Sequence, residues 1–259
     1  MYLPSFTLDE KLAVITGATK GIGRAIGRAI ALAFAVAGAD VVLISRTESD
    51  LSKVKSEVES FGSKAYTICS DIKDYAYIIN ELDRLIGARP IHIWVNNAGI
   101  NIRSEALNVT EAEWSEIIDV NMKCSFFLAQ AAAKRMKESG TGKIINVSSV
   151  GGHVALRTGV VYAMTKSAII QMTKNLALEW GKYGINVNAI GPWYFPTALT
   201  EELLKDDQYV QEILYRTSLK RIGKLEELAG TAVFLASDAS NYITGQTLFV
   251  DGGMTIYGF

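Results

Sequence analysis

Three residues of this sequence have the types and spacing needed for proton transfer to a carbonyl oxygen. Tyr162 and Lys166 are four residues apart in a segment with helical periodicity, so both side chains fall on one face of the predicted helix. Ser149 lies thirteen residues earlier and ends the run 143–149, which predicts a buried strand with a hydroxyl at its C-terminal end. A phenol, an ammonium and a hydroxyl in this arrangement could protonate a carbonyl oxygen while a hydride reaches the carbonyl carbon.

Length and composition limit what kind of protein carries these residues. A chain of 259 residues with a formal net charge of -1 fits one globular domain, residues 1–259, without the basic stripe of a nucleic-acid-binding protein. No apolar stretch reaches the roughly 18 residues that span a bilayer, and the first residues lack a signal peptide. We therefore expect a cytoplasmic protein with no membrane partner. The two cysteines and two histidines lack metal-ligand spacing, which predicts no metal site.

Short apolar runs, rich in Val and Ile, alternate with longer amphipathic segments along the whole chain. The predicted strands are Leu12–Thr16, Val41–Ile44, Lys64–Ile68, Ile91–Val95, Lys143–Val147, Ile185–Ile190 and Thr247–Val250. The predicted helices lie near Ile22–Ala37, Asp50–Phe61, Tyr75–Ile86, Thr110–Ser139, Val161–Tyr183, Glu201–Arg216 and Leu225–Ala236. This alternation predicts a three-layer, doubly wound (Rossmann) α/β fold with a seven-stranded parallel sheet in a single domain. A ligand crevice is then expected at the carboxyl ends of the strands.

A glycine-rich turn follows the first predicted strand. Gly17, Gly21 and Gly23 have the spacing Gly-x3-Gly-x-Gly and stand directly before the first predicted helix. Glycines there let the backbone approach a pyrophosphate, which the free N–H groups and the dipole of a helix N-terminus favour. Glycines also mark ordinary tight turns, but the position between a strand and a helix favours a phosphate-binding turn.

The end of the second predicted strand bears on the choice of cofactor. A site for NAD usually has an acid there for the ribose 2′-hydroxyl, whereas this chain has Ser45 followed by Arg46. A guanidinium beside a hydroxyl suits a 2′-phosphate, and Lys20 in the glycine-rich turn adds a second cation. The alternative is that Arg46 and Lys20 are solvated surface charges. We predict NADP(H) rather than NAD(H).

Proton transfer by Tyr162 at neutral pH requires a lowered pKa. Tyrosine titrates near about 10, and a lowering by about three units requires roughly 4 kcal/mol of added stabilisation of the phenolate. Lys166, one helical turn away, and a cationic nicotinamide would both stabilise the phenolate. We therefore expect the pKa of Tyr162 to be lowered in the working site.

Two other segments leave alternatives open. Residues 96–99, Asn-Asn-Ala-Gly, follow the fourth predicted strand and either line the adenosine side of the crevice or form an Asx turn. Asp71 follows the third predicted strand. It either accepts a hydrogen bond from an adenine amino group or caps the helix that starts near Tyr75.

A tandem repeat lies at the start of the first predicted helix, where Gly-Arg-Ala-Ile at 23–26 is followed by the same four residues at 27–30. Four residues add one turn, roughly 6 Å, to a helix. Because a bound phosphate fixes the start of the helix, we expect the extra turn at its C-terminal end or as a bulge near Gly27. A first helix of ordinary length without a bulge would contradict both expectations.

The glycine-rich turn, the Asn-Asn-Ala-Gly segment, Asn121, Ser149, Tyr162 and Lys166 together resemble the short-chain dehydrogenase/reductase family in its single-domain members. The resemblance runs over essentially the whole chain, to Ile-Thr-Gly-Gln at 243–246 and Val-Asp-Gly-Gly at 250–253. It implies that Tyr162 is the general acid in reduction and the base in oxidation, with its pKa lowered by Lys166, which also holds the nicotinamide ribose. It implies that Ser149 orients the substrate carbonyl and that Asn121 anchors a water linking Lys166 to solvent.

The same resemblance implies that Pro192 and Thr197 lie beside the nicotinamide carboxamide. The residues expected to bind the cofactor are Gly17, Thr19, Lys20, Gly21, Ile22, Gly23, Ser45, Arg46, Asp71, Ile72, Asn97, Ala98, Gly99, Tyr162, Lys166, Pro192 and Thr197.

Within the family, residues 97–103 and 192–197 are most similar to gluconate 5-dehydrogenases and related sugar-acid oxidoreductases. The implied reaction interconverts a secondary alcohol and a ketone on a sugar acid, such as gluconate and 5-keto-gluconate. 3-Oxoacyl-carrier-protein reductases and tropinone reductases share nearly the same motifs and stay as alternatives. The residues expected to contact substrate are Asn101, Arg103, Ser149, His153, Trp193 and Tyr194. Of these, Arg103 suits a carboxylate, while Asn101 and His153 suit hydroxyls. Each could equally be an ordinary rim residue, and for His153 the rim interpretation is favoured.

Three further expectations concern the surroundings of the site. Trp193 replaces the glycine usual after the proline at 192, and its indole either walls the substrate pocket or packs the following loop. Residues 201–216 predict a mobile helical lid. The long amphipathic segments 110–139 and 161–183 resemble the helix-pair interface of the family, which implies a homotetramer. A rival interpretation, a cofactor-binding regulator without turnover, is disfavoured because all four catalytic residue types are present.

Overall fold

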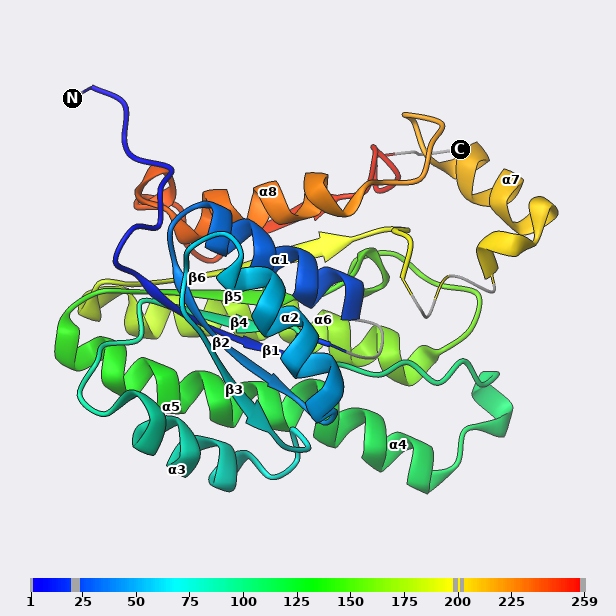
Figure 1. The fold of residues 1–259 in the computed structure, drawn as a ribbon. Coiled ribbons are helices and arrows are strands. Elements are labelled where there is room, and N and C mark those ends of the chain that lie inside the picture. The colour runs from blue at the N-terminus through cyan, green and yellow to red at the C-terminus, as the bar shows by residue number, and fades with distance from the viewer. Residues whose placement is uncertain (1, 20–23, 198–199, 201–202, 257–259) are drawn as a thin grey trace.

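Seven parallel strands form the centre of the protein in a computed structural model, which describes residues 2–19, 24–197, 200 and 203–256 (Figure 1). Their order across the sheet is β3-β2-β1-β4-β5-β6-β7. The strands are β1 Leu12–Thr16, β2 Asp40–Ser45, β3 Ala65–Cys69, β4 Ile93–Asn96, β5 Gly142–Val147, β6 Ile185–Pro192 and β7 Thr247–Val250. All seven predicted strands are therefore present, with shifts only at their ends. The order reverses direction between β1 and β4, which is where a doubly wound fold opens its ligand crevice.

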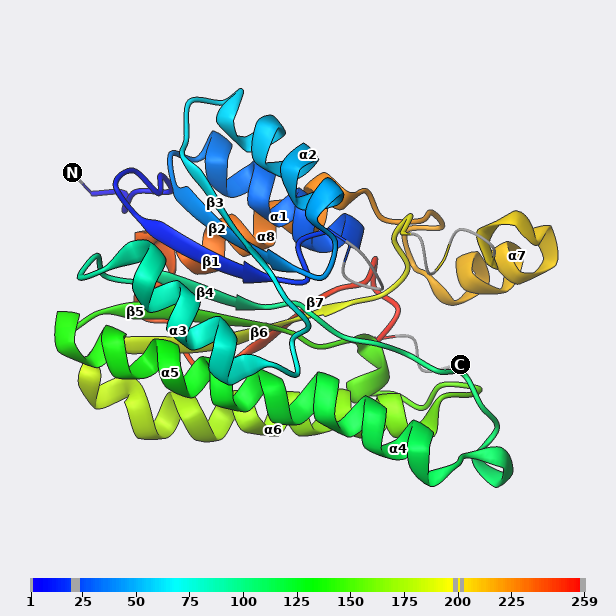
Figure 2. The ribbon, with the colours of Figure 1, turned by 60° about the horizontal axis from the view of Figure 1, so that its bottom comes forward.

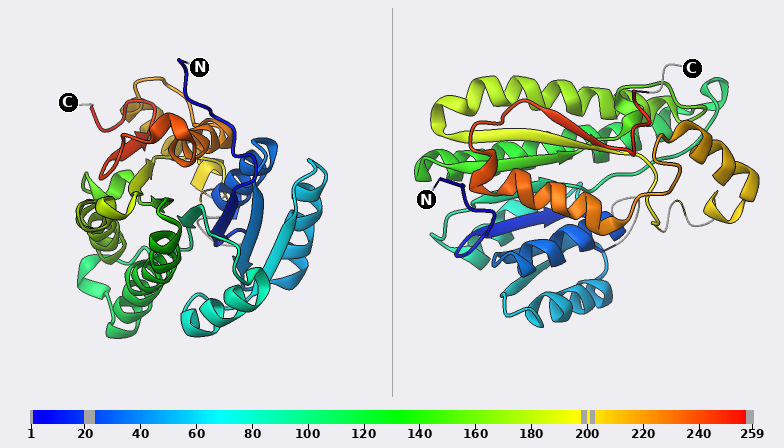
Figure 3. Two further views of the ribbon diagram at one scale, coloured as in Figure 1. Left: turned by 90° about the vertical axis from the view of Figure 1, so that its left-hand side faces the viewer. Right: turned by 90° about the horizontal axis from the view of Figure 1, so that it is seen from above.

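Helices cover both faces of the sheet, which gives the three predicted layers (Figures 2 and 3). The helices are α1 Arg24–Val36, α2 Glu48–Glu59, α3 Tyr75–Ile86, α4 Glu111–Ile118, α5 Cys124–Ser139, α6 Val160–Trp180, α7 Asp207–Arg216 and α8 Leu225–Ala236. Helices α1, α2 and α8 pack on one face, and α3, α5 and α6 on the other. Helix α7 stands apart, beyond the end of the sheet where β6 finishes.

The strands have continuous apolar sequences because both of their faces are buried. All five residues of β1 are buried. Its alternate residues belong to opposite layers: Leu12 and Val14 pack with α3, α5 and α6, whereas Ala13 and Ile15 pack with α1, α2 and α8. The alternation follows from the two-residue repeat of a strand.

The predicted helix near Thr110–Ser139 consists of three pieces. Between α4 and α5 lies a single π-helical segment, Asp119–Lys123. Such wide turns inside an α-helix occur often at functional sites, and Asn121 lies in this one. The apolar periodicity of the sequence did not reveal this π-helical segment, because the helices on either side of it both keep a buried face.

The predicted helix Glu201–Arg216 begins later than expected. Helix α7 starts at Asp207 after a 3-10 turn at Leu203–Lys205, and residues 201–202 lie outside the described residues. Asp206 ends the preceding turn by accepting a hydrogen bond from Tyr209 N at 3.1 Å, which is an N-cap contact.

Helix α1 corrects the expectation for the tandem repeat. It has 13 residues, close to the usual length, and runs from Arg24 to Val36 as one α-helix with no bulge in that range. Both places proposed for an extra turn, the C-terminal end and the vicinity of Gly27, are therefore wrong. The helix ends at a turn through Gly38, whose φ of 101° needs a glycine.

Among the residues that the structure describes, no helix is both long enough and apolar enough to span a membrane.

Candidate active site

Ser149, Tyr162 and Lys166 come from two elements that meet at the carboxyl end of β5. Ser149 follows β5 by two residues and caps a 3-10 turn, Val150–Gly152, with its Oγ accepting from Gly151 N at 3.1 Å. Tyr162 and Lys166 project from the first turns of α6. The Ser149 hydroxyl is hydrogen-bonded to Tyr162, and Lys166 Nζ is 5.5 Å from the centre of the Tyr162 ring. All three side chains line one cavity of about 90 Å³.

Lys166 is held at the end of β5 rather than left free. Its Nζ donates to Val147 O at 2.8 Å, and its own carbonyl oxygen accepts from Ser148 Oγ at 2.8 Å. The hydroxyl of Ser148, the residue before Ser149, thus links α6 to the end of the sheet. Lys166 is buried, and burial lowers the pKa of its ammonium group to about 8. An ammonium that titrates near neutral pH can exchange its proton during turnover.

Tyr162 is subject to opposing effects on its pKa. Burial raises the pKa of the phenol, while the hydrogen bond from Ser149 and the charge of Arg103 act to lower it. Burial is the larger effect, so the groups of the protein itself raise this pKa. The lowering expected from Lys166 together with a cationic nicotinamide stays a prediction. Arg103 is a contributor that the sequence did not reveal.

Asn121 is fully buried in the π-helical segment, with its side chain engaged on both sides. Its Nδ2 donates to Ile100 O at 2.9 Å and to Thr165 Oγ1 at 3.1 Å, and its Oδ1 accepts from Ile100 N at 2.8 Å. These bonds fix the segment after β4 against α6, next to Tyr162 and Lys166. The water expected between Asn121 and Lys166 stays a prediction.

A second hollow lies over the carboxyl ends of β1, β2 and β3 and contains most of the residues expected on the adenosine side of the cofactor. Its lining is Gly17, Ile44, Ser45, Arg46, Ser70, Asp71, Ile72, Ala98, Gly99, Ile100 and Val120. Gly99 also lines the catalytic cavity, so the two hollows lie on either side of this residue. Thr19 is buried and hydrogen-bonded to Ser45. Lys20, Gly21, Ile22 and Gly23 lie outside the described residues.

The structure also bears on the alternatives for residues 96–99 and Asp71. Asn97 Nδ2 donates to the carbonyl oxygens of Thr16 and Gly17, both at 3.0 Å, which ties the end of β4 to the turn after β1. Asp71 does not cap α3, because Asp74 is the residue at that position. The Asp71 carboxylate instead accepts from Lys73 N at 2.9 Å and lies 3.6 Å from Arg46 Nη1.

The catalytic cavity opens into a larger one, of about 390 Å³, on the side toward α7. Asn101, Arg103, Trp193 and Tyr194 line both. Arg103 Nη1 donates to Tyr209 Oη at 3.4 Å, and the hydroxyls of Tyr194 and Tyr209 are hydrogen-bonded. Burial, with the hydrogen bond from Tyr209, raises the pKa of Tyr194 to about 12, so the Tyr194 phenol is a neutral hydroxyl donor at pH 7. A cation and two hydroxyls in one cavity suit an anionic, polyhydroxylated ligand.

Trp193 fulfils both roles that the sequence left open. The indole lines both cavities, and its Nε1 donates to Thr217 Oγ1 at 3.2 Å, which anchors the loop after β6. Pro192 and Thr197, on either side of this loop segment, line the catalytic cavity. Their place beside the nicotinamide carboxamide stays a prediction.

His153 is a predicted substrate contact that lies outside the two cavities. It is exposed, its ring packs 5.1 Å from that of Phe249, and it is absent from the described residues that line the two cavities. Asn101, by contrast, has a buried Oδ1 with no hydrogen-bond partner among the described residues, as expected of an acceptor for a ligand hydroxyl.

Several cavity residues were not found from the sequence. They are Ile26, Val147, Leu156, Phe195 and Thr200 in the catalytic cavity, and Arg157, Tyr209 and Glu212 in the larger one. Arg157 and Glu212 form an ion pair that joins the loop before α6 to α7. The apolar residues resemble ordinary core positions, and the Tyr209 position depends on where α7 docks, so no local pattern marked them.

Comparison with known proteins places the chain in a family. A family profile described as Enoyl-(Acyl carrier protein) reductase matches residues 21–255. Gluconate 5-dehydrogenase of Gluconobacter oxydans (strain 621H) is 38% identical over 255 residues, 97% of this chain and 97% of that protein. The 2-dehydro-3-deoxy-D-gluconate 5-dehydrogenase of Escherichia coli (strain K12) is 38% identical over 258 residues, 98% of each.

A solved structure agrees with these sequence relatives. The crystal structure of a gluconate 5-dehydrogenase from Burkholderia cenocepacia J2315, in complex with NADP and tartrate, superposes with a TM-score of 0.92 at 37% identity. The match covers 99% of this chain and 100% of that one. The chain belongs to the short-chain dehydrogenase/reductase family, as its motifs indicated.

Proposed function

We propose that this protein is an NADP(H)-dependent oxidoreductase that interconverts a secondary alcohol and a ketone on a sugar acid. The observation that carries the proposal is one cavity that brings Ser149, Tyr162 and Lys166 together with Arg103. Two relatives named for gluconate-type substrates, each about 38% identical, support the substrate class. The solved relative that contains NADP and tartrate, itself a hydroxy acid, supports both cofactor and substrate.

The crevice fits a dinucleotide. A Cβ atom at Gly99 would lie 3.3 Å from Asn121 Oδ1 and 3.6 Å from Lys166 Nζ, so the glycine leaves the space beside these two side chains free. Ser45, Arg46 and Ile72 would hold the adenosine end, and Lys166, Pro192 and Thr197 the nicotinamide end. NADP(H), when bound, supplies or accepts the hydride.

The residues of the chain then carry out the proton transfer. Ser149 donates a hydrogen bond to the substrate oxygen and fixes its place beside Tyr162 Oη. Tyr162 gives its proton to that oxygen in reduction and takes it back in oxidation. Lys166 stabilises the phenolate so formed, and Arg103 adds a second positive charge at the substrate side. Trp193 and Leu156 exclude water from the apolar wall of the cavity.

Arg46 is expected to select NADPH over NADH. Its ion pair with Asp71 joins side chains that are 62% and 31% exposed, so it is weak and can open for a 2′-phosphate. In Arg46→Asp, an acid replaces the guanidinium, and we expect the NADPH-to-NADH ratio of kcat/KM to fall by about 10²-fold. Steady-state kinetics with both cofactors measures this ratio.

The matched control for this change is Arg84→Asp, an equal change of charge on the exposed side of α3. It should leave the cofactor ratio unchanged. A wild-type enzyme that uses NADH as well as or better than NADPH would contradict the assignment of Arg46.

Arg103 is expected to bind the carboxylate of the substrate. A charge-assisted hydrogen bond contributes about 1.5–3 kcal/mol, so Arg103→Gln should raise KM for 5-keto-gluconate by roughly 10- to 100-fold. Because Arg103 also acts on the pKa of Tyr162, both this substrate and a neutral cyclic ketone should lose some kcat. Only the carboxylate substrate should show the rise in KM. Equal changes in KM for the two would show that Arg103 makes no carboxylate contact.

A substrate screen with NADPH tests the substrate class. Keto-gluconates, β-ketoacyl thioesters and small cyclic ketones represent the sugar-acid, carrier-protein-reductase and tropinone-reductase alternatives. The proposal expects the highest kcat/KM with a keto-gluconate, and a clear preference for either other class would replace it.

The homotetramer stays a prediction, supported by apolar side chains exposed on the outer layer. Leu178 is 86% exposed and Met164 47% exposed on α6, and Trp114 on α4 is also partly uncovered. Burial of such a surface against a second copy would stabilise an assembly. Sedimentation equilibrium decides the stoichiometry. The cytoplasmic location also stays a prediction.

A further inference from the structure

The tandem Gly-Arg-Ala-Ile repeat is not explained by the proposed function. The C-terminal part of α1 is fixed by its packing: Ile30 and Phe34 are fully buried, and Leu8 N donates to Ala37 O at 2.7 Å, just beyond the helix. The relation of the repeat to the turn after β1 is therefore decided at the N-terminal end of the described helix. The structure provides a reference point there, which is Gly27.

Gly27 packs directly against the turn that follows β1. A Cβ atom on Gly27 would lie 2.6 Å from Gly17 O, 2.5 Å from Asn97 Nδ2 and 3.0 Å from Ala18 Cα. Asn97 cannot withdraw freely, because its Nδ2 donates to two carbonyl oxygens of the same turn. In a dinucleotide-binding turn the last glycine permits this close packing of helix against strand. Gly27 has this position.

The residue before Gly27 faces the catalytic cavity. Ile26 is 5% exposed and lines the cavity that contains Tyr162, Lys166 and Thr197. It lies in the first turn of α1, where main-chain N–H groups lack helical acceptors and favour an anion. Ala25 stands two residues before Gly27, where the spacing Gly-x3-Gly-x-Gly would have its middle glycine.

We propose that the second copy of the repeat completes the phosphate-binding turn, with Ala25, Ile26 and Gly27 in the roles first expected of Gly21, Ile22 and Gly23. The assignment rests on the proposed use of NADP(H). It has a consequence for affinity: a methyl group stands where a glycine lets the backbone approach the pyrophosphate. The native chain therefore binds NADPH more weakly than a chain with glycine at position 25.

The substitution Ala25→Gly tests this consequence in the full-length protein. NADPH binding is measured by calorimetry without substrate, so the result does not depend on turnover. We expect Kd to fall by about tenfold. If residues 21–23 form the turn instead, position 25 belongs to an ordinary helix, and glycine there lowers Tm while Kd stays the same or rises. That outcome overturns the assignment.

A shortened chain gives an independent test. Removal of residues 23–26 and removal of residues 27–30 yield the same polypeptide, in which Gly21 stands two residues before the packing glycine. This chain should bind NADPH at least as tightly as Ala25→Gly. Weaker binding by a chain with wild-type circular dichroism would contradict the proposal.

A pair of glycine substitutions completes the comparison. Gly27→Ala should weaken NADPH binding by about tenfold or more, because its methyl group meets the Gly17 carbonyl, whereas Gly23→Ala should change Kd by less than about twofold. The reverse pattern overturns the assignment. If Gly27→Ala does not fold, Ala25→Gly and the shortened chain still decide. A wild-type protein that binds neither NADPH nor NADH would overturn the proposed function itself, which is a different result from unaltered binding in the variants.

Discussion

Tyr162→Phe should reduce carbonyl reduction by at least about 10²-fold, and up to about 10⁴-fold, while NADPH binding persists. The substitution removes only the hydroxyl that gives up the proton. The ring keeps its packing in a position that is 7% exposed, so the cavity and the fold should survive. Ser149 and Lys166 remain but cannot replace the acid, since neither is held at the place of the Tyr162 hydroxyl. Initial rates with NADPH and the best substrate of the screen, together with NADPH titration of each protein, measure both quantities.

Tyr242→Phe is the matched control for this experiment. Tyr242 is fully exposed in the segment before β7, and the same loss of a hydroxyl there should leave kcat unchanged. Retained turnover in Tyr162→Phe would contradict the proton-transfer mechanism. An inactive wild type that still binds NADPH would favour the rival interpretation, a cofactor-binding regulator.

The sequence predicted the fold and the catalytic group because each follows from local patterns. Apolar runs such as 12–16 identify strands buried on both faces, and parallel strands bring their carboxyl ends to one edge. Ser149 and Tyr162 were therefore expected at the same edge before any contact was known. The four-residue separation of Tyr162 and Lys166 needed only the geometry of a helix.

Features that depend on packing between distant segments were not predictable in the same way. The π-helical turn at Asn121 leaves no mark in apolar periodicity. The role of Gly27 became visible only from its distance to Gly17 and Asn97, since the two copies of the repeat are identical in sequence. The position of His153 outside both cavities depends on the turn after Ser149, whose direction is not encoded in residue type. Tyr209 enters the site through the docking of α7, which the sequence does not specify.

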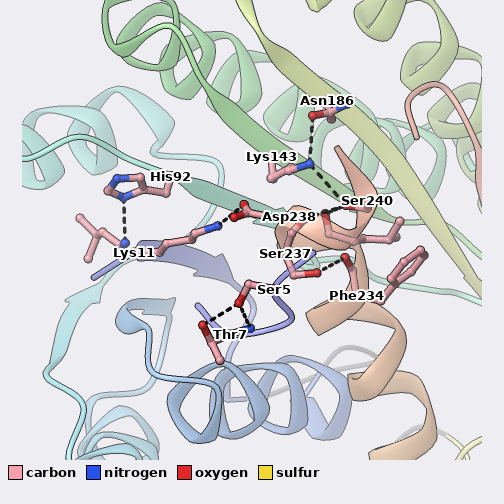
Figure 4. A network of polar contacts seen from close by, with 12 residues as sticks. Ser5, Thr7, Lys11, His92, Lys143, Asn186, Phe234, Ser237, Asp238 and Ser240 are labelled. Atoms are coloured by element: carbon pink, nitrogen blue, oxygen red, sulfur yellow. Dashed lines mark hydrogen bonds and ion pairs between the residues drawn. The ribbon is translucent and has the colours of Figure 1, made fainter. Parts of the chain in front are cut away.

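Lys143 is a further residue whose burial could not be predicted from the sequence. It was expected near the beginning of a strand, where a lysine usually reaches solvent, yet it is only 7% exposed. Its Nζ donates to Asn186 Oδ1 at 3.0 Å and to Ser240 Oγ at 3.4 Å (Figure 4). The nearby carboxylate of Asp238 is 2.9 Å from Lys11 Nζ, so Lys143 has no close anion of its own in the described network. Burial, with the charge of Lys11, lowers the pKa of Lys143 to about 8.

The lowered pKa of Lys143 predicts that its burial reduces the free energy of unfolding by an amount that depends on pH. The folded state disfavours the charged ammonium, whereas the unfolded chain keeps it with a pKa of 10.5. Below about pH 8 both states hold the proton and the folded state carries the whole cost, about 3 kcal/mol. Between about pH 8 and 10.5 the folded state releases the proton first, so the free energy of unfolding rises with pH.

Lys143→Met should therefore raise the free energy of unfolding at pH 7 by about 2 kcal/mol, since the lost hydrogen bonds offset about 1 kcal/mol. At pH 9.5 the gain should nearly vanish, because the wild-type lysine is then neutral in the folded state. Urea unfolding at one protein concentration and at both pH values measures the difference between variant and wild type. Lys166, whose pKa is also lowered, contributes equally to both proteins and cancels.

Lys53→Met, on the exposed face of α2, is the control and should change stability by no more than about 0.5 kcal/mol at either pH. A gain for Lys143→Met that was the same at pH 7 and 9.5 would show that improved packing, and not relief from a buried charge, stabilises the variant. Because Lys143 lies at the amino end of the sheet, away from the catalytic cavity, kcat and the NADPH affinity should not change. This gain in stability is thus expected at a residue that takes no part in the chemistry.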